Sequence, residues 1–84
     1  MSQLSKKKAQ AQYQRAFGKH LALTIERRGY SSIYDFWIRK AGDHLSRASI
    51  NFLVLGEKDP KLSTIRILAR LLNVAPKDLL DFEK

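Results

Sequence analysis

Glycine and proline divide this chain into short segments whose apolar residues recur with the period of an α-helix. The first segment repeats an aromatic or aliphatic residue at every fourth position and then reaches a glycine: Tyr13, Phe17, Leu21, Ile25 and Gly29. Further boundaries follow at Gly42, Gly56 and Pro76. No segment alternates apolar and polar residues as a half-buried strand would. The spacing predicts an all-α fold, a compact bundle of five helices.

The same signals give the expected ends of these helices. We expect helices over residues 9–28, 33–41 and 46–55, a fourth after a cap at Ser63, and a fifth starting at Pro76. Ser32 and Asp35 form a capping-box-like start for the second helix. The fourth carries one apolar stripe, made of Ile65, Leu68, Ala69 and Leu72. Residues 1–8 are polar and basic and predict a flexible arm, and residues 9–84 are long enough for a single domain.

Charge narrows the class of partner. The chain has sixteen Lys and Arg against eight Asp and Glu; ten of the basic and three of the acidic residues lie within residues 1–47. This asymmetry suits a polyanion such as nucleic acid, an acidic protein or an anionic membrane face, and charge alone does not choose among them. There is no cysteine, so disulfides, zinc-cysteine sites and thiol catalysis are excluded.

No apolar run approaches the roughly 20 residues of a membrane span, and the opening "MSQLSKKKAQAQ" lacks the apolar centre of a signal peptide. We therefore expect a cytoplasmic protein without a membrane partner. His20 and His44 have no acidic or cysteine neighbours at metal-ligand spacing, and no nucleophile, phosphate loop or paired carboxylates accompany them. We expect no metal, no cofactor and no enzymatic activity.

The stretch "LSRASINFLVLG", residues 45–56, predicts a helix with two different sides. Ile50, Leu53 and Val54 are available to a core, while polar groups that suit base edges lie elsewhere on the helix: Ser46, Arg47, Ser49 and Asn51. The DNA major groove admits one helix and displays a distinct pattern of donors and acceptors for each base pair. An arginine suits guanine and an asparagine suits adenine, so this segment is a candidate reader of DNA.

Residues 17–82 resemble the lambda-repressor-like helix-turn-helix domain of Cro-type (XRE family) bacterial and phage regulators. "FGKHLALTIERRGYS" is similar to the first helix and glycine turn of that family, "LSRASINFLVLG" to its recognition helix, and "PKLSTIRILARLLNVAPKDLL" to its last two helices. The resemblance implies that the core takes Ile50 and Leu53, and that the residues facing bases are Arg47, Ala48, Asn51 and Phe52.

The chain departs from the family pattern in two ways. Ile25 and Val54 occupy positions where the family commonly has an arginine–glutamate pair; replacing both partners of a buried pair by aliphatic residues is often neutral or stabilising. The segment 31–42 and the turn "GDHL" are each about two residues longer than usual, so we expect a lengthened second helix and turn.

Contacts to phosphate would supply most of the affinity for DNA and no sequence reading. The candidates are the residues at the starts of the second and third helices, the neighbouring basic residues and the arm: Ser32, Ser46, Arg39, Lys40, Lys58, Lys61, Lys6, Lys7 and Lys8. Solvated charges without a partner are the alternative. The C-terminal helix is rich in apolar residues, and Leu79, Leu80 and Phe82 are candidates either for the core or for a dimer surface.

These expectations combine into a sequence-specific regulator of transcription, most simply a repressor, that binds a palindromic operator in double-stranded DNA as a homodimer through residues 46–55. A phage repressor, a restriction-modification controller and an antitoxin that also binds a toxin all fit. Two rivals stay open. One is a protein-interaction module on the same fold, which predicts an exposed patch of Tyr34, Trp37 and Ile38; the other is a basic protein that coats nucleic acid without sequence preference.

Overall fold

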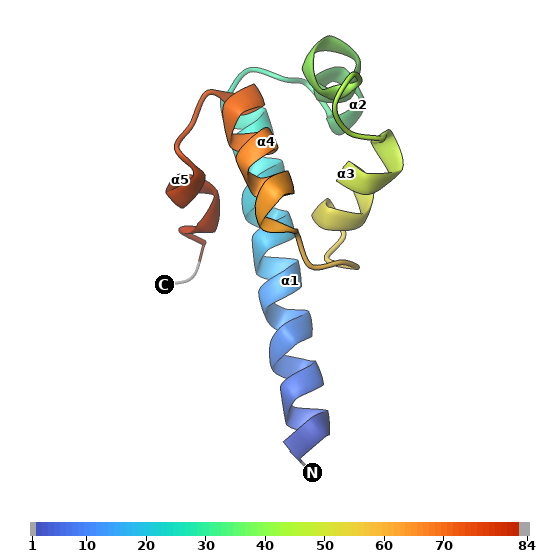
Figure 1. Ribbon diagram of the computed structural model, residues 1–84, viewed down its shortest axis with the longest axis vertical. Helices are drawn as coiled ribbons and strands as arrows, with labels where there is room; N and C mark the ends of the chain where they lie inside the picture. The colour runs from blue at the N-terminus through green and yellow to red at the C-terminus, as the bar shows by residue number, and fades with distance from the viewer. Residues whose placement is uncertain (1, 83–84) are drawn as a thin grey trace.

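The computed structural model describes the backbone of residues 2–82 and the side chains of residues 12–82. The helices are α1 (Ser2–Arg27), α2 (Ile33–Phe36), the π-helical turn η1 (Trp37–Ala41), α3 (Arg47–Val54), α4 (Leu62–Leu72) and α5 (Pro76–Leu80). No strand occurs in the described part of the chain, and the prediction of an all-helical fold is confirmed. In Figure 1 the shorter helices gather around the C-terminal part of α1.

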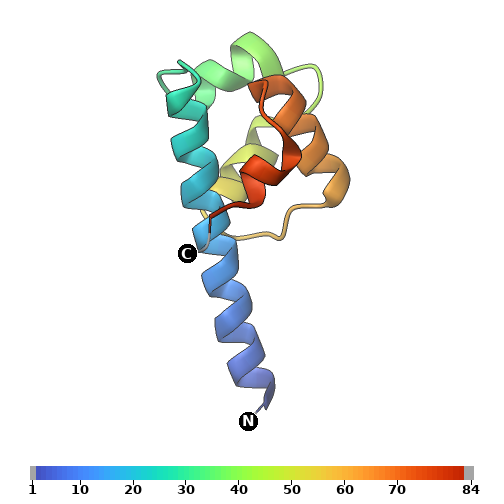
Figure 2. The same ribbon diagram turned by 90° about the vertical axis from the view of Figure 1, so that its left-hand side faces the viewer.

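The first helix is longer than the sequence predicted. α1 begins at Ser2, so the backbone of residues 2–8 is helical where we expected an arm without regular structure. Residues 2–12 contain neither glycine nor proline, and alanine, glutamine and lysine are good helix formers. The N-terminal part of α1 extends past the other helices in both views, Figure 1 and Figure 2.

The later helix boundaries follow the glycine and proline signals closely. The backbone of Gly56, just after α3, has a φ of 75°, a conformation that side chains with a Cβ rarely adopt. α4 starts earlier than predicted: Lys61 occupies the cap position and its carbonyl oxygen accepts from the Ile65 amide at 3.0 Å, so Ser63 lies in the first turn and does not cap. Helical hydrogen bonding therefore begins directly after the extended segment at Pro60.

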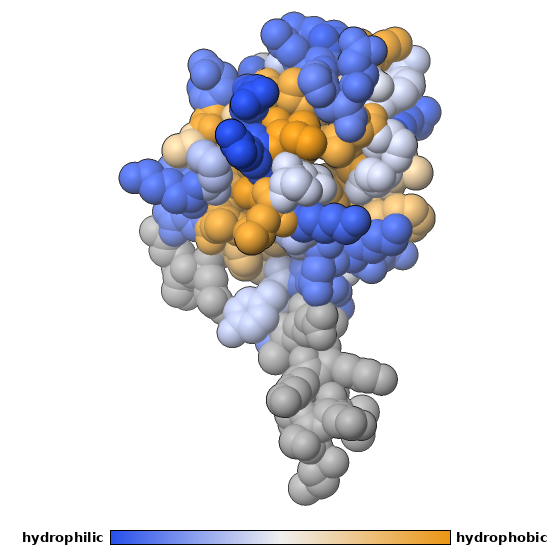
Figure 3. All heavy atoms as spheres, viewed as in Figure 1, coloured by the Kyte–Doolittle hydropathy of each residue, from blue (hydrophilic) through white to orange (hydrophobic). Residues whose placement is uncertain are grey.

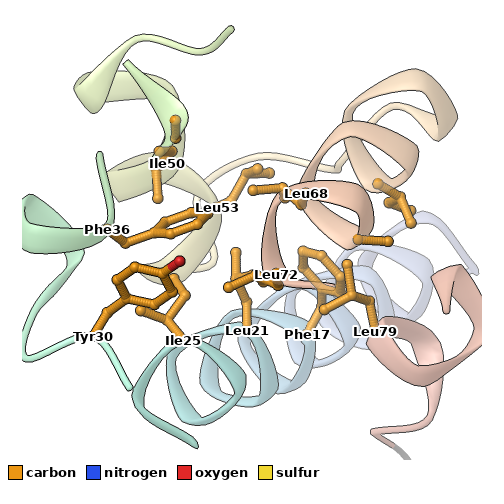
Figure 4. Close-up of a cluster of buried hydrophobic side chains, with 13 residues drawn as sticks. Phe17, Leu21, Ile25, Tyr30, Phe36, Ile50, Leu53, Leu68, Leu72 and Leu79 are labelled. Atoms are coloured by element: carbon orange, nitrogen blue, oxygen red, sulfur yellow. The ribbon is translucent and has the colours of Figure 1, made fainter. Parts of the chain in front are cut away.

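The buried side chains form one cluster to which every α-helix contributes. Figure 4 shows α1 supplying Phe17, Leu21 and Ile25, opposite Ile50 and Leu53 of α3. The other large members come from α2, α4, α5 and the segment after α1: Phe36, Ile65, Leu68, Leu72, Leu79 and Tyr30. Burying a side chain of this size contributes about 1.5–3 kcal/mol. A domain of this length depends on its hydrophobic core for most of its stability. The same core packs α3 against α1.

The predicted second helix contains an irregularity that its sequence did not reveal. Residues 33–41 are helical as expected, but only Ile33–Phe36 is α-helical and Trp37–Ala41 forms a π turn. In a π turn the amide of one residue bonds five positions back, here from Gly42 to the Trp37 carbonyl at 2.7 Å. The turn therefore lies within the segment that we expected to be lengthened.

Candidate nucleic-acid interface

A side-chain cap fixes the start of α3. Ser46 has an extended backbone, and its Oγ accepts from the Ser49 amide at 3.0 Å. The same hydroxyl donates to the Ser49 Oγ at 2.8 Å. Capping of this kind contributes about 1 kcal/mol to a helix, which matters for a helix of eight residues. The predicted cap is confirmed, and both hydroxyls are already hydrogen-bonded to each other.

The two sides of α3 separate as its sequence predicted. Ile50 and Leu53 are buried. The residues predicted to read bases lie toward the surface: Arg47, Ala48, Ser49 and Phe52 are exposed, and Asn51 is half-buried. Ile25 of α1 is also buried, and Val54 of α3 is partly buried against the core. The helix thus has one side held by the bundle and a polar side open to a ligand.

Two glycines bring α3 and α1 unusually close together. A Cβ on Gly18 would lie 2.3 Å from the carbonyl oxygen of Val54 and 2.6 Å from that of Leu53. A Cβ on Gly56 would lie 2.8 Å from the Cα of Arg15. The C-terminal end of α3 therefore rests on the backbone of α1 at positions where only glycine fits. This contact sets the distance between the C-terminal end of α3 and the backbone of α1.

Aromatic rings hold a cation near each end of α3. The Cζ of Arg47 lies 4.9 Å from the centroid of the Tyr34 ring, and the Nζ of Lys58 lies 4.8 Å from the centroid of the Phe52 ring. Both distances are within the range of a cation–π interaction. Sequence reasoning singled out Arg47 but missed Tyr34 as its neighbour, because 13 positions separate them and no helical period links the two segments.

Trp37 supports the segment between the second helix and α3. Its indole Nε1 donates to the Leu45 carbonyl at 2.9 Å. On the other side of that segment, the amides of His44 and Leu45 both donate to the Ala41 carbonyl at 2.9 Å. Hydrogen bonds therefore hold the segment between Ala41 and Ser46 from both sides.

Most of the predicted phosphate contacts near the second helix already have partners. The Ser32 Oγ accepts from the Asp35 amide at 2.9 Å. The Arg39 guanidinium pairs with the Asp35 carboxylate at 3.1 Å and lies over the Tyr30 ring. The Ser31 amide, which donates to that carboxylate at 2.9 Å, and then the Arg39 guanidinium lower the pKa of Asp35. Lys40 is exposed.

Two further phosphate candidates, Lys58 and Lys61, line a cleft between α3 and α4. The cleft has a volume of about 220 Å³, and its polar lining consists of Ser49, Lys58, Asp59, Lys61 and Thr64, so two lysines face one carboxylate there. α4 begins beside it without a side-chain cap, so its first amides are available to an anion. Thr64 is a further candidate that the sequence pattern did not suggest. The predicted contacts Lys6, Lys7 and Lys8 have side chains outside the described residues.

The three residues proposed for a dimer surface have different environments. Leu79 is completely buried within the chain and is not available to a second subunit, so its assignment to an interface is wrong. The Phe82 ring packs edge-on against Phe17 with 5.9 Å between centroids. Leu80 is 47% exposed and borders a shallow apolar cleft of about 180 Å³ together with Tyr13. Figure 3 shows apolar surface framed by hydrophilic side chains on the face that carries α4 and α5.

His20, which the sequence left without a role, has a structural contact. His20 Nε2 donates to the Asp78 carbonyl at 2.6 Å. Among the described side chains, no three histidine, aspartate or glutamate residues come together as ligands for a metal. In the same part of the chain, no helix is both long enough and apolar enough to cross a bilayer.

The arrangement can present an arginine, small polar groups and an aromatic ring from one short helix, with two lysines and the start of another helix beside it. These are the groups that contact base edges and phosphates in protein–DNA complexes. Comparison with known proteins adds no family to this description: no family model, no curated protein and no solved structure matches the chain.

Proposed function

We propose that this protein is a sequence-specific DNA-binding regulator of transcription, in which residues 33–41 (α2 and η1), the following turn and α3 act as a lambda-repressor-like helix-turn-helix. The observation that carries the proposal is the division of α3. Arg47, Ala48 and Ser49 are exposed at its N-terminal end, while Ile50 and Leu53 fix the opposite side in the core. A reading helix needs this arrangement, because its N-terminal residues must reach base edges from a rigid support.

The chemistry of the exposed residues suits direct readout. An arginine binds guanine through two parallel hydrogen bonds to O6 and N7, and such a contact contributes about 1–3 kcal/mol of discrimination. Phe52, half-exposed beside Lys58, offers apolar surface to a thymine methyl group. Asn51, half-buried in the middle of α3, is the candidate for a contact to adenine.

Affinity independent of sequence would come from the surroundings of the cleft between α3 and α4. Lys58 and Lys61 provide charge, and the uncapped first turn of α4 provides amides. Each phosphate neutralised adds close to one unit to the slope of log affinity against log salt. The net charge of +8 is consistent with steering toward a polyanion.

A homodimer would place two copies of α3 in successive major grooves, about 34 Å apart, on a palindromic operator. Leu80 and Tyr13 are the exposed apolar residues that we assign to the dimer surface, with Phe82 behind them. A dimer bound over a promoter would block polymerase, so repression is the simplest outcome. A phage repressor, a restriction-modification controller and an antitoxin all fit this description, and a site placed beside the promoter would let the dimer recruit polymerase instead.

Selection of fragments from a genomic DNA pool tests the proposal. The purified protein should enrich fragments that share a palindrome, and Arg47→Ala should relax the preference at one base pair of each half-site by about 1–3 kcal/mol. Lys58→Ala is the matched control: it should weaken binding to all fragments about equally and reduce the salt dependence. Equal affinity for every fragment, lost together as salt rises, would instead identify a protein that coats nucleic acid.

One observation favours a second candidate. Tyr34 and Ile38 are 47% and 58% exposed, and they lie one helical turn apart on the outer side of α2 and η1. Two of the three residues expected in the exposed patch of a protein-interaction module, such as an antitoxin, are therefore exposed. Under this candidate Ile38→Ser would prevent co-purification with the partner protein, while Arg47→Ala would leave that complex intact.

A further inference from the structure

A row of contacts connects the turn before α3 to the first residue of α3. The Leu45 carbonyl accepts from the Trp37 indole at 2.9 Å, and the centroid of the Trp37 ring lies 6.1 Å from that of Tyr34. The Tyr34 ring in turn lies under the Arg47 guanidinium, 4.9 Å from its Cζ. Tyr34 is about half-exposed and Arg47 is exposed. The far end of the row therefore reaches the surface at the residue that we assign to base reading.

Contact with a ring restrains an arginine without using its donors. The ring covers one face of the planar guanidinium, while the five N–H groups point outward in the plane and stay free for a ligand. No carboxylate among the described residues pairs with Arg47. The Tyr34 ring is thus the contact that the structure gives to the Arg47 guanidinium.

We propose that Tyr34 is a positioning residue that sets the specificity of α3, by holding Arg47 in the orientation in which it reads one base pair. This inference rests on the proposed function. An arginine that is free in solution loses side-chain freedom when it binds a base, and a ring that already restrains it reduces that loss. Trp37, fixed by its own hydrogen bond, limits where the Tyr34 ring can move.

The pair at the other end of α3 provides an internal comparison. There the ring belongs to α3 and the cation comes from the following loop, because Lys58 lies over Phe52. Lys58 is assigned to phosphate. Loss of its ring contact should not change the preference at the base pair that Arg47 reads.

The test measures affinities of full-length variants for the selected operator and for operators with single base-pair changes. Arg47→Ala identifies the position read by Arg47. Tyr34→Leu, which removes the ring, should lower the discrimination at that position about 2- to 5-fold, the range for an exposed cation–π contact. Tyr34→Phe keeps the ring and should keep the discrimination. In the Arg47→Ala background, Tyr34→Leu should have no further effect at that position.

A measurement on the free protein checks the contact itself. The NMR resonances of the Arg47 δ protons should carry a ring-current shift in wild type and in Tyr34→Phe, and should lose it in Tyr34→Leu. Circular dichroism verifies that each variant is folded, and Tyr34→Gln serves as a second variant without a ring. A role of Tyr34 in stability alone would leave the base preference unchanged.

The outcomes separate the inference from the function on which it rests. Wild-type protein with no base preference at all would refute the proposed function. The inference alone would be refuted if wild type showed a base preference that Arg47→Ala relaxed and Tyr34→Leu did not change. An equal loss for every operator in Tyr34→Leu would also refute it, because this would make Tyr34 a general DNA contact.

Discussion

Replacing Gly18 by alanine is the most direct test of how α3 is seated on α1. The added methyl group would lie 2.3 Å and 2.6 Å from the carbonyl oxygens of Val54 and Leu53, whereas ordinary contacts begin at 3.4 Å. Relief requires a separation of about 1 Å between α1 and the end of α3. Both obstacles are backbone atoms, so no side-chain rotation can make room.

The sign of the effect is diagnostic. At an exposed helical site, glycine to alanine stabilises a protein by about 0.5–1 kcal/mol. Overfilling a packed site costs about 1–3 kcal/mol, and the short distances to backbone place Gly18→Ala at the upper end of that range. The expected net loss in the free energy of unfolding is therefore about 2 kcal/mol. For a domain of this size, this corresponds to a decrease in Tm of roughly 8–16 °C.

Urea and thermal unfolding followed by circular dichroism measure this change. Lys19→Ala, at the exposed neighbouring position, is the control and should alter the free energy of unfolding by less than about 0.5 kcal/mol. A Gly18→Ala protein as stable as wild type, or more stable, would refute the reasoning, because the backbones of α1 and α3 would then not approach one another at this point.

Three further predictions follow from individual contacts. Trp37→Phe removes the donor to the Leu45 carbonyl and should lower the free energy of unfolding in urea by about 1–2 kcal/mol; an unchanged value would mean that the bond does not stabilise the turn. The pKa of Asp35 is lowered in the folded protein, so its contribution to the free energy of unfolding should be complete above about pH 4. That contribution should decrease as the pH falls through the folded pKa. Asp35→Asn should flatten this part of the curve of unfolding free energy against pH. Leu79→Ala should cost about 2–5 kcal/mol, whereas Leu80→Asp should be nearly neutral for the fold and should shift the sedimentation coefficient toward that of a monomer if this face forms the dimer.

The helices were predictable because local signals place them. The four-residue spacing in α1, the stripe in α4 and the glycine after α3 each reflect a property of a single segment. The division of α3 into a buried and an exposed side was predictable for the same reason, since Ile50 and Leu53 are three positions apart and lie on one face. Periodicity identifies a face of a helix well.

Periodicity does not identify what that face meets. Leu79 and Leu80 are adjacent and chemically identical, and only the angle at which α5 packs on α1 and α4 decides that one is buried and the other exposed. The π turn is a similar case, because Trp37–Ala41 has the composition of an ordinary helix. Local periodicity does not mark the bond from the Gly42 amide to the Trp37 carbonyl, which gives this turn its extra residue.

At the candidate site too, the sequence did not show which residues from different helices contact each other. The sequence identified Arg47 as a base-reading candidate, yet an arginine discriminates between bases only if its guanidinium is oriented. The orienting group, Tyr34, belongs to a different helix and was assigned to a rival protein-binding patch. Because its ring both contacts Arg47 and remains half-exposed, a partner protein bound to Tyr34 and Ile38 would disturb the residue that reads DNA. Binding of a protein and reading of DNA would then compete at one tyrosine, so the two candidate functions are coupled.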